Sequence, residues 1–171
     1  MQSGGQYNGT CWLDDMNVAS IITLFGFIGF CFLAASPGAL FRPGEWYESL
    51  AKPKWRPPNW LFGPAWTILY LMIAISGWLV WRRVGFMTAI FPLAVYVVSL
   101  LFNTAWSVFF FGLHRPNFAF VDVVLLWFSI VATIFLFYPI EQYSALLLLP
   151  YLFWVTFAAT LNLAIWRMNR T

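Results

Sequence analysis

The residues best suited to chemistry lie in one aromatic segment, residues 46–66. It holds four prolines, three basic residues and the tryptophans Trp46, Trp55, Trp60 and Trp66. Aromatic rings on a chain stiffened by proline present flat apolar faces together with indole N–H donors. A segment of this kind suits covering a cavity and holding a flat, greasy molecule. We therefore interpret its tryptophans as candidate ligand-binding residues.

Residues for acid–base or metal chemistry are sparse. His114 is the only histidine, and Cys11 and Cys31 are the only cysteines. A metal site needs a cluster of His, Cys or carboxylate ligands, which one histidine does not provide. The sequence also lacks a nucleophile–base pair, a phosphate-binding glycine loop and a carboxylate pair. We expect no metal site and no required cofactor, and acid–base catalysis has weak support.

The composition places these residues in a membrane protein. The 171-residue chain is 62% hydrophobic and 9% charged, whereas a soluble domain averages about 25% charged residues. Runs such as Leu146–Leu149 do not alternate as the strands of a membrane barrel do. Five runs have about the 20 apolar residues that a spanning helix needs, namely 18–41, 64–81, 86–111, 117–138 and 143–166. We predict an all-α fold, an integral membrane bundle of five transmembrane helices.

The spans leave room for one domain, 17–171, after a mobile polar tail at 1–16 and with the loop 42–63 as a cover for the ligand. Seven basic residues lie on the side of that loop, against two on the other side. The positive-inside rule then predicts the N-terminus outside and the C-terminus inside. No basic face or nucleic-acid module accompanies the net charge of +3, so we expect no nucleic-acid partner.

Polar side chains inside the spans gather on the side of the loop. At about 1.5 Å per residue, Asp122 lies roughly 8 Å inside the fourth span and Asn103 roughly 12 Å from the end of the third. Because polar groups in lipid are costly, we predict a polar-tipped cavity beneath the loop. Pro150 should bend the fifth helix next to that cavity, and its neighbour Tyr151 is a further candidate. The predicted wall is aromatic and consists of Trp66, Tyr70, Trp106 and Trp154.

Several of these residues also have a structural interpretation. Asn103 could bond neighbouring helices. Asp122 could pair with Arg115, two helical turns away, or with a cation of the loop, rather than serve a ligand or a proton. Trp154 could be a core residue whose indole N–H needs a partner in the middle of the span. The sequence leaves these alternatives open.

Three separate motifs occur in a recognisable order: Lys52-Pro53-Lys54-Trp55-Arg56-Pro57-Pro58, then Asn103-Thr104-Ala105-Trp106, then Pro150-Tyr151-Leu152-Phe153-Trp154. Together they resemble the signature of the TspO/MBR family, the tryptophan-rich sensory proteins and translocator proteins, also called peripheral benzodiazepine receptors. The resemblance covers residues 18–169. Asp122 falls where that family carries an early acidic residue in the fourth span.

The resemblance implies a homodimeric five-helix bundle that binds porphyrins, haem-pathway tetrapyrroles, sterols and synthetic aromatic drugs beneath the first loop. Porphyrin or haem would be a ligand of such a protein. Leu163 stands where animal members carry a tyrosine of a sterol-recognition pattern. The expectation is therefore a bacterial member in the cell membrane, with doubtful high-affinity sterol binding. By matching position, the resemblance implies the ligand set Trp66, Tyr70, Asn103, Trp106, Trp154 and Ala158.

Three functions remain in competition, in the following order. The first is a sensor or carrier that binds porphyrins or other planar lipophilic molecules. The second is light- and oxygen-dependent degradation of porphyrin, because Trp66 and Trp154 match tryptophans that the family implicates in that breakdown. The third is a membrane scaffold for partner proteins.

Overall fold

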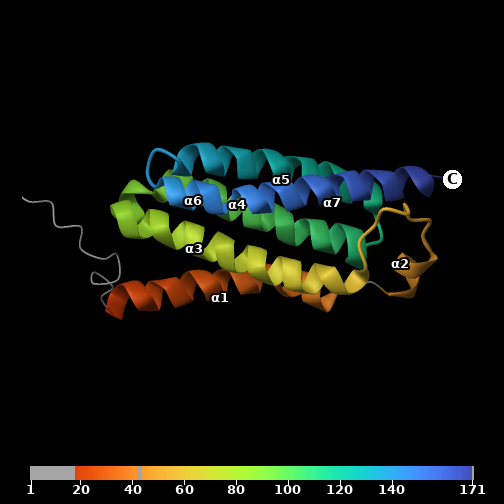
Figure 1. Ribbon diagram of the computed structural model, residues 1–171, viewed down its shortest axis with the longest axis horizontal. Helices are drawn as coiled ribbons and strands as arrows, with labels where there is room; N and C mark the ends of the chain where they lie inside the picture. The colour runs from red at the N-terminus through yellow and green to blue at the C-terminus, as the bar shows by residue number, and fades with distance from the viewer. Residues whose placement is uncertain (1–17, 42–43, 171) are drawn as a thin grey trace, which may run out of the picture.

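Five helices long and apolar enough to cross a membrane dominate the fold. The computed structural model describes residues 18–41 and 44–170, and these are all-helical or loop, which confirms the predicted fold class. The long helices lie alongside one another, with α2 and the C-terminus at the same end of the bundle (Figure 1). The predicted tail at 1–16 lies outside the described residues. The elements are α1 (Val18–Leu40), α2 (Glu45–Ser49), the 3₁₀ turn η1 (Asn59–Leu61), α3 (Phe62–Thr88), α4 (Ile90–Ser107), the π-helical turn η2 (Val108–Gly112), α5 (Pro116–Phe137), α6 (Gln142–Leu147) and α7 (Leu149–Met168).

The second span is longer than the predicted 64–81. The prediction ended it before Arg82 and Arg83, but α3 carries both arginines. Long basic side chains keep their stems against apolar surface while their charged ends reach the interface. The guanidinium of Arg82 lies over the Trp78 ring, 5.2 Å from its centroid. Charge alone was therefore a poor marker of the helix end.

Gly85 is the residue that breaks α3. Its φ of 75° lies in the left-handed region, which glycine reaches without the steric cost that a side chain brings. The chain turns there and α4 starts at Ile90, so the predicted third span, 86–111, began too early. At its other end α4 passes directly into η2, where Leu113 N–H donates to Val108 O over five residues.

The fifth predicted span, 143–166, is divided into α6 and α7. The division falls at Leu148, and Pro150 occupies the first turn of α7. Proline has no N–H to continue the hydrogen-bond ladder, so it is tolerated at a helix start and breaks a helix interior. The fifth span is thus interrupted beside Pro150, and a bend at that position stays a prediction.

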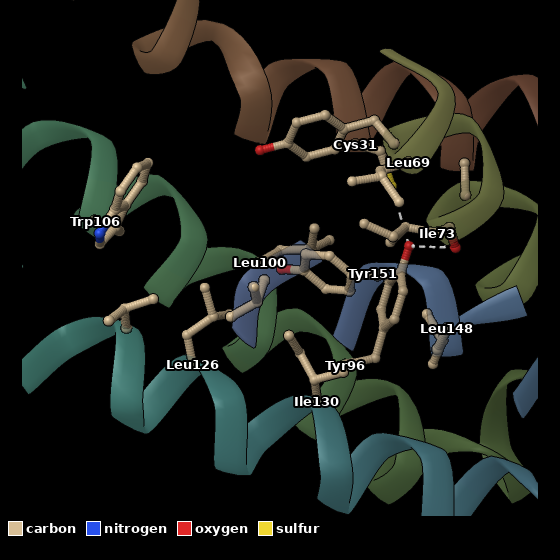
Figure 2. Packing of buried hydrophobic residues seen from close by; sticks show 14 of the residues in the cluster. Cys31, Leu69, Ile73, Tyr96, Leu100, Trp106, Leu126, Ile130, Leu148 and Tyr151 are labelled. Atoms are coloured by element: carbon tan, nitrogen blue, oxygen red, sulfur yellow. Dashed lines mark hydrogen bonds between the residues drawn. The ribbon is translucent and has the colours of Figure 1, made fainter. Parts of the chain in front are cut away.

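The core lies where α1, α3, α4, α5 and α7 meet, and the Tyr96 hydroxyl within it is hydrogen-bonded to neighbouring helices (Figure 2). Tyr96 is 1% exposed; its hydroxyl donates to the carbonyl of Ile73 (3.2 Å) and shares a hydrogen bond with Cys31 Sγ (3.0 Å). Buried hydroxyls need such partners because lipid offers none. Cys31 acts here as a small buried packing residue that ties α1 to α4.

Two polar side chains order the loop between α1 and α3, and one of them fastens it to the bundle. Lys52 donates to the carbonyl oxygens of Tyr47, Glu48 and Leu50, which closes the loop on itself. Asn169, directly after α7, bonds both backbone groups of Ala51, one as acceptor and one as donor, each at 3.0 Å. The loop is thereby pinned across the end of the bundle to a residue far away in the sequence.

Replacing Asn169 with Ala removes both bonds to Ala51 and should loosen the loop. Because each bond contributes about 1 kcal/mol, we expect amide hydrogen exchange in residues 50–58 to become about fivefold faster or more. Asn169→Asp keeps the acceptor and should have a smaller effect. Thr160→Ala is the matched control, since Thr160 bonds only its own helix at Phe157 O. Unchanged exchange in Asn169→Ala would show that other contacts hold the loop.

Candidate ligand-binding site

A cavity of about 700 Å³ lies beneath the loop, where the sequence predicted one. Helices α1, α3, α4 and α7 form its walls, α2 and η1 cover it, and η2 closes one side. None of the described residues that line it carries a formal charge. They are Phe32, Ala35, Ser36, Gly38, Tyr47, Asn59, Trp60, Phe62, Gly63, Trp66, Thr67, Tyr70, Asn103, Trp106, Ser107, Phe110, Phe111, Ala158, Leu161, Asn162 and Ile165.

Six of the predicted ligand-binding residues line this cavity: Trp60, Trp66, Tyr70, Asn103, Trp106 and Ala158. They come from η1, α3, α4 and α7, so the fold brings together residues that are widely separated in the sequence. Trp46, Trp55, Asp122, Tyr151 and Trp154 do not line it. The positions of these five residues explain what they do instead.

The aromatic walls are built from two ring groups. On α3, Trp66 and Tyr70 are one helical turn apart, with ring centroids at 5.6 Å. From α4 and η2, Trp106 stacks on Phe110 at 5.5 Å and 25°. Phe110 is carried by η2, whose wider π-helical turn shifts the residues after α4 relative to a continuous α-helix. The cavity therefore presents flat ring faces and edges on two sides.

The floor of the cavity is a hydrogen-bonded chain across three helices. Tyr70 on α3 donates to Asn103 Oδ1 (3.3 Å), and Asn103 Nδ2 on α4 donates to the Tyr151 hydroxyl on α7 (2.7 Å). Asn103 and Tyr151 are each 1% exposed. The interhelical interpretation of Asn103 is thus confirmed, while its side chain also reaches the cavity. Tyr151 supports the floor from behind.

Asn162, which also lines the cavity, forms a second polar link. Its Oδ1 accepts from Trp106 Nε1 (3.1 Å), and its Nδ2 donates to Pro116 O (2.8 Å). These bonds join α7 to α4 and to the start of α5. They also hold the Trp106 ring, and hence its stack with Phe110, in one orientation.

Asp122 is buried but does not pair with Arg115 as one interpretation of the sequence suggested. It is 6% exposed, and within residues 18–41 and 44–170 its Oδ2 has no hydrogen-bond partner. Asp122 shares a buried helix face with Ala119 and Val123, whereas Arg115 is exposed at the start of α5. Two helical turns, about 10 Å, separate them. Asp122 thus sits in the helix packing behind the cavity.

Trp154 contacts the cavity wall from outside. Its ring meets Trp66 edge to face at 6.4 Å and Phe62 at 5.8 Å. It borders a second, apolar groove of about 420 Å³ between α3 and α7, which Ile68 and Phe153 also line. The partner expected for its indole N–H is missing, since no acceptor among the described residues bonds Nε1.

The loop tryptophans have two roles: some pack on the bundle, and one lies at the edge of the cavity. Trp46 stacks on His114 (centroids 4.3 Å apart, 22°), and Trp55 meets Phe157 edge to face at 5.8 Å. These two rings fasten the loop to the bundle. Trp60 is 71% exposed and lies at the edge of the cavity. His114 is exposed, yet its ring takes part in fixing the loop.

Two lining residues that matter for the chemistry, Tyr47 and Phe110, were not predicted from the sequence. Tyr47 is 4% exposed, and burial raises the pKa of its phenol above the usual range, an effect that the nearby Arg56 guanidinium partly offsets. The hydroxyl therefore stays protonated at neutral pH and can donate a hydrogen bond. Tyr47 was not predicted because the prediction included only the tryptophans of the loop segment, such as its neighbour Trp46. Phe110 was missed because its direction depends on the π-helical turn.

Fold and site together define a membrane protein of five spanning helices with an uncharged aromatic cavity beneath an aromatic loop. Residues 27–167 match the model of the TspO/MBR family. This match covers most of the chain, and the protein belongs to the TspO/MBR family.

Similar proteins occur in bacteria and animals. The chain is 43% identical over 154 residues to the protein CrtK of Rhodobacter capsulatus, covering 86% of this chain and 94% of that protein. It is 38% identical over 143 residues to the tryptophan-rich sensory protein of Cereibacter sphaeroides, covering 84% and 89%. It is 40% identical over 137 residues to the human translocator protein, covering 77% and 81%. The resemblance seen in the sequence is thereby confirmed.

Removing the hydroxyl of Tyr151 should destabilise the bundle more than removing that of Tyr70. Tyr151→Phe leaves the buried Asn103 Nδ2 without its 2.7 Å acceptor, whereas Tyr70→Phe removes a longer, 3.3 Å bond. We expect Tyr151→Phe to cost about 1–3 kcal/mol and Tyr70→Phe to cost less. Thermal unfolding of the purified protein in detergent measures both. The reverse order would mean that Asn103 Nδ2 finds another acceptor.

Proposed function

We propose that this protein binds porphyrins, such as protoporphyrin IX, or other planar lipophilic molecules in the cavity beneath the 42–63 loop, as a membrane sensor or carrier. The observation that carries the proposal is the cavity itself: about 700 Å³, walled by aromatic rings and without a formally charged side chain among its described lining residues. Ligand sites are commonly about 300–1,000 Å³ and mostly apolar, with a few placed polar groups.

The polar groups of the cavity suit a ligand with hydrogen-bonding atoms on a flat body. Tyr47 offers a protonated hydroxyl on the loop side, and Asn103 lies at the floor. Trp66, Tyr70 and Trp106 supply aromatic surface, which binds flat conjugated rings by offset or edge contacts. The ligand class implied by the family resemblance supports the same conclusion.

We further propose a homodimer in a bacterial cell membrane, with the N-terminus outside and the C-terminus inside. The charge bias supports this orientation, because the loop and the C-terminus lie at one end of the bundle (Figure 1). That end carries Lys52, Lys54, Arg56, Arg115, Arg167 and Arg170. The bacterial relatives support the location.

Filling the cavity tests the binding function. Ala158 lies on α7, is 7% exposed and lines the cavity. Ala158→Leu should therefore weaken protoporphyrin IX binding about tenfold or more, because an added side chain occupies space that the ligand needs. Quenching of tryptophan fluorescence in the dark measures binding to the detergent-purified protein.

Ala94→Leu is the matched control for this experiment. Ala94 is exposed on the outer face of α4 and lines neither cavity nor groove. The Ala94→Leu variant should bind protoporphyrin IX like the wild type. Equal binding by Ala158→Leu and wild type would place the ligand elsewhere, and the absence of saturable binding by the wild type would contradict the proposed function.

Degradation of porphyrin under light is a second candidate, favoured by one contact. The Trp66 ring lines the cavity and meets the Trp154 ring at 6.4 Å and 85°. Paired indoles next to a light-absorbing ligand could supply electrons to it, with oxygen as the oxidant. Trp154 would act only through Trp66, because it does not line the cavity itself.

The two tryptophans should therefore differ under illumination. If the protein consumes porphyrin, Trp66→Phe should slow formation of a discrete product more than Trp154→Phe does. Absorption spectra and chromatography of illuminated, aerated samples follow the product, with Trp55→Phe as a control in the loop anchor. If porphyrin bleaches at the same rate in all variants, the bleaching is photochemistry of the porphyrin alone and these tryptophans take no part in it.

A further inference from the structure

We propose that Arg56 binds an acidic group of the ligand at the mouth of the cavity, so that the protein selects flat amphiphiles carrying a carboxylate over their uncharged counterparts. The inference rests on the proposed binding function and adds the charge of the ligand to it. Arg56 itself belongs to none of the candidate sets drawn from the sequence.

The interior of the cavity cannot hold the charge of such a ligand. None of its described lining residues is acidic or basic. Moving a carboxylate from water into an apolar site without a partner is very costly. A ligand with a flat apolar body and an acidic group would therefore bind with the body inside and the acidic group at the mouth, beneath the loop.

Arg56 is a basic side chain of the loop that contacts residues lining the cavity. Its Nη1 donates to Asn59 Oδ1 at 3.0 Å, and its guanidinium interacts with the hydroxyl of Tyr47. Asn59 and Tyr47 both line the cavity. Arg56 is half-buried, and these two contacts use only part of its five donors. The remaining N–H groups suit the fork geometry of a carboxylate.

The charged residues near Arg56 in the loop, Glu48 and Lys52, already have other partners. Glu48 Oε1 accepts from Asn59 Nδ2 at 2.9 Å, and its Oε2 lies 3.9 Å from Lys52 Nζ. Lys52 is further occupied by three backbone carbonyls of the loop. In the described part of the chain, Arg56 forms no ion pair with a carboxylate. Lys52 counters the charge of Glu48, which leaves Arg56 to receive an anion.

Two ligands with the same ring system, one acidic and one uncharged, test this proposal. Protoporphyrin IX carries two carboxylic acids, and its dimethyl ester carries none, while the flat ring system is the same. Each is titrated in the dark into the full-length protein in an uncharged detergent. We expect the wild type to prefer the diacid, and Arg56→Gln to weaken diacid binding about tenfold or more without changing ester binding. Added salt should narrow the preference of the wild type.

Lys54→Gln is the matched control, because Lys54 is an exposed loop cation two residues away and is not attached to the lining residues. It should keep the preference for the diacid. Arg56→Lys keeps the charge without the fork and should fall between wild type and Arg56→Gln. Circular dichroism and size exclusion confirm that each variant is folded.

The remaining outcomes overturn the proposal in distinguishable ways. Equal loss of both ligands in Arg56→Gln would make Arg56 a residue that only shapes the loop. Equal loss of the diacid in Lys54→Gln and Arg56→Gln would indicate general attraction by the loop charges. If the wild type binds both ligands equally, the binding function stands and the charge selection fails. If it binds neither ligand saturably, both proposals fail.

Discussion

The structure depends on one constraint: a polar side chain buried in a membrane-spanning bundle has no water to bond, so its favourable hydrogen-bond partners lie within the protein. Asn103 meets it by joining α4 to Tyr70 on α3 and to Tyr151 on α7. Asn162 meets it by joining α7 to Trp106 on α4 and to the start of α5. Because each link spans different helices, together they fix the spacing of the bundle at the depth of the cavity. The same residues that satisfy the constraint therefore shape the site.

The loop solves a related problem at the membrane surface. A long connection without regular structure exposes backbone groups and orders poorly. Here Lys52 satisfies three carbonyls, Asn169 satisfies both backbone groups of Ala51, and the rings of Trp46 and Trp55 pack on the bundle. The aromatic content of the loop thus serves two purposes. Some of its rings hold the cover in place, and others face the cavity.

Composition and run length were enough to predict the five-helix fold, because helices satisfy their own backbone in lipid. The depth of Asn103 located the cavity, since polar groups at one level of several spans converge. The lining set was harder to predict because the spans are apolar on every side, so the sequence does not encode their rotation about the axis. Asp122 and Tyr151 therefore turned out to lie behind the wall, and Trp154 outside it. Phe110 depended on a π-helical turn.

If the cavity binds a ligand as proposed, the division of charge between cavity and loop limits how the protein can discriminate among ligands. The walls select for shape and aromatic surface, because rings such as Trp66 and Trp106 carry no net charge to pair with a ligand. The charge of a ligand would be recognised where water and basic side chains meet the cavity, which the proposal places at the loop around Arg56 and Tyr47. Changes in the loop can therefore alter which ligand is preferred while the interhelical bonds of Asn103 stay intact. Shape and charge selection are thus physically separable in this fold.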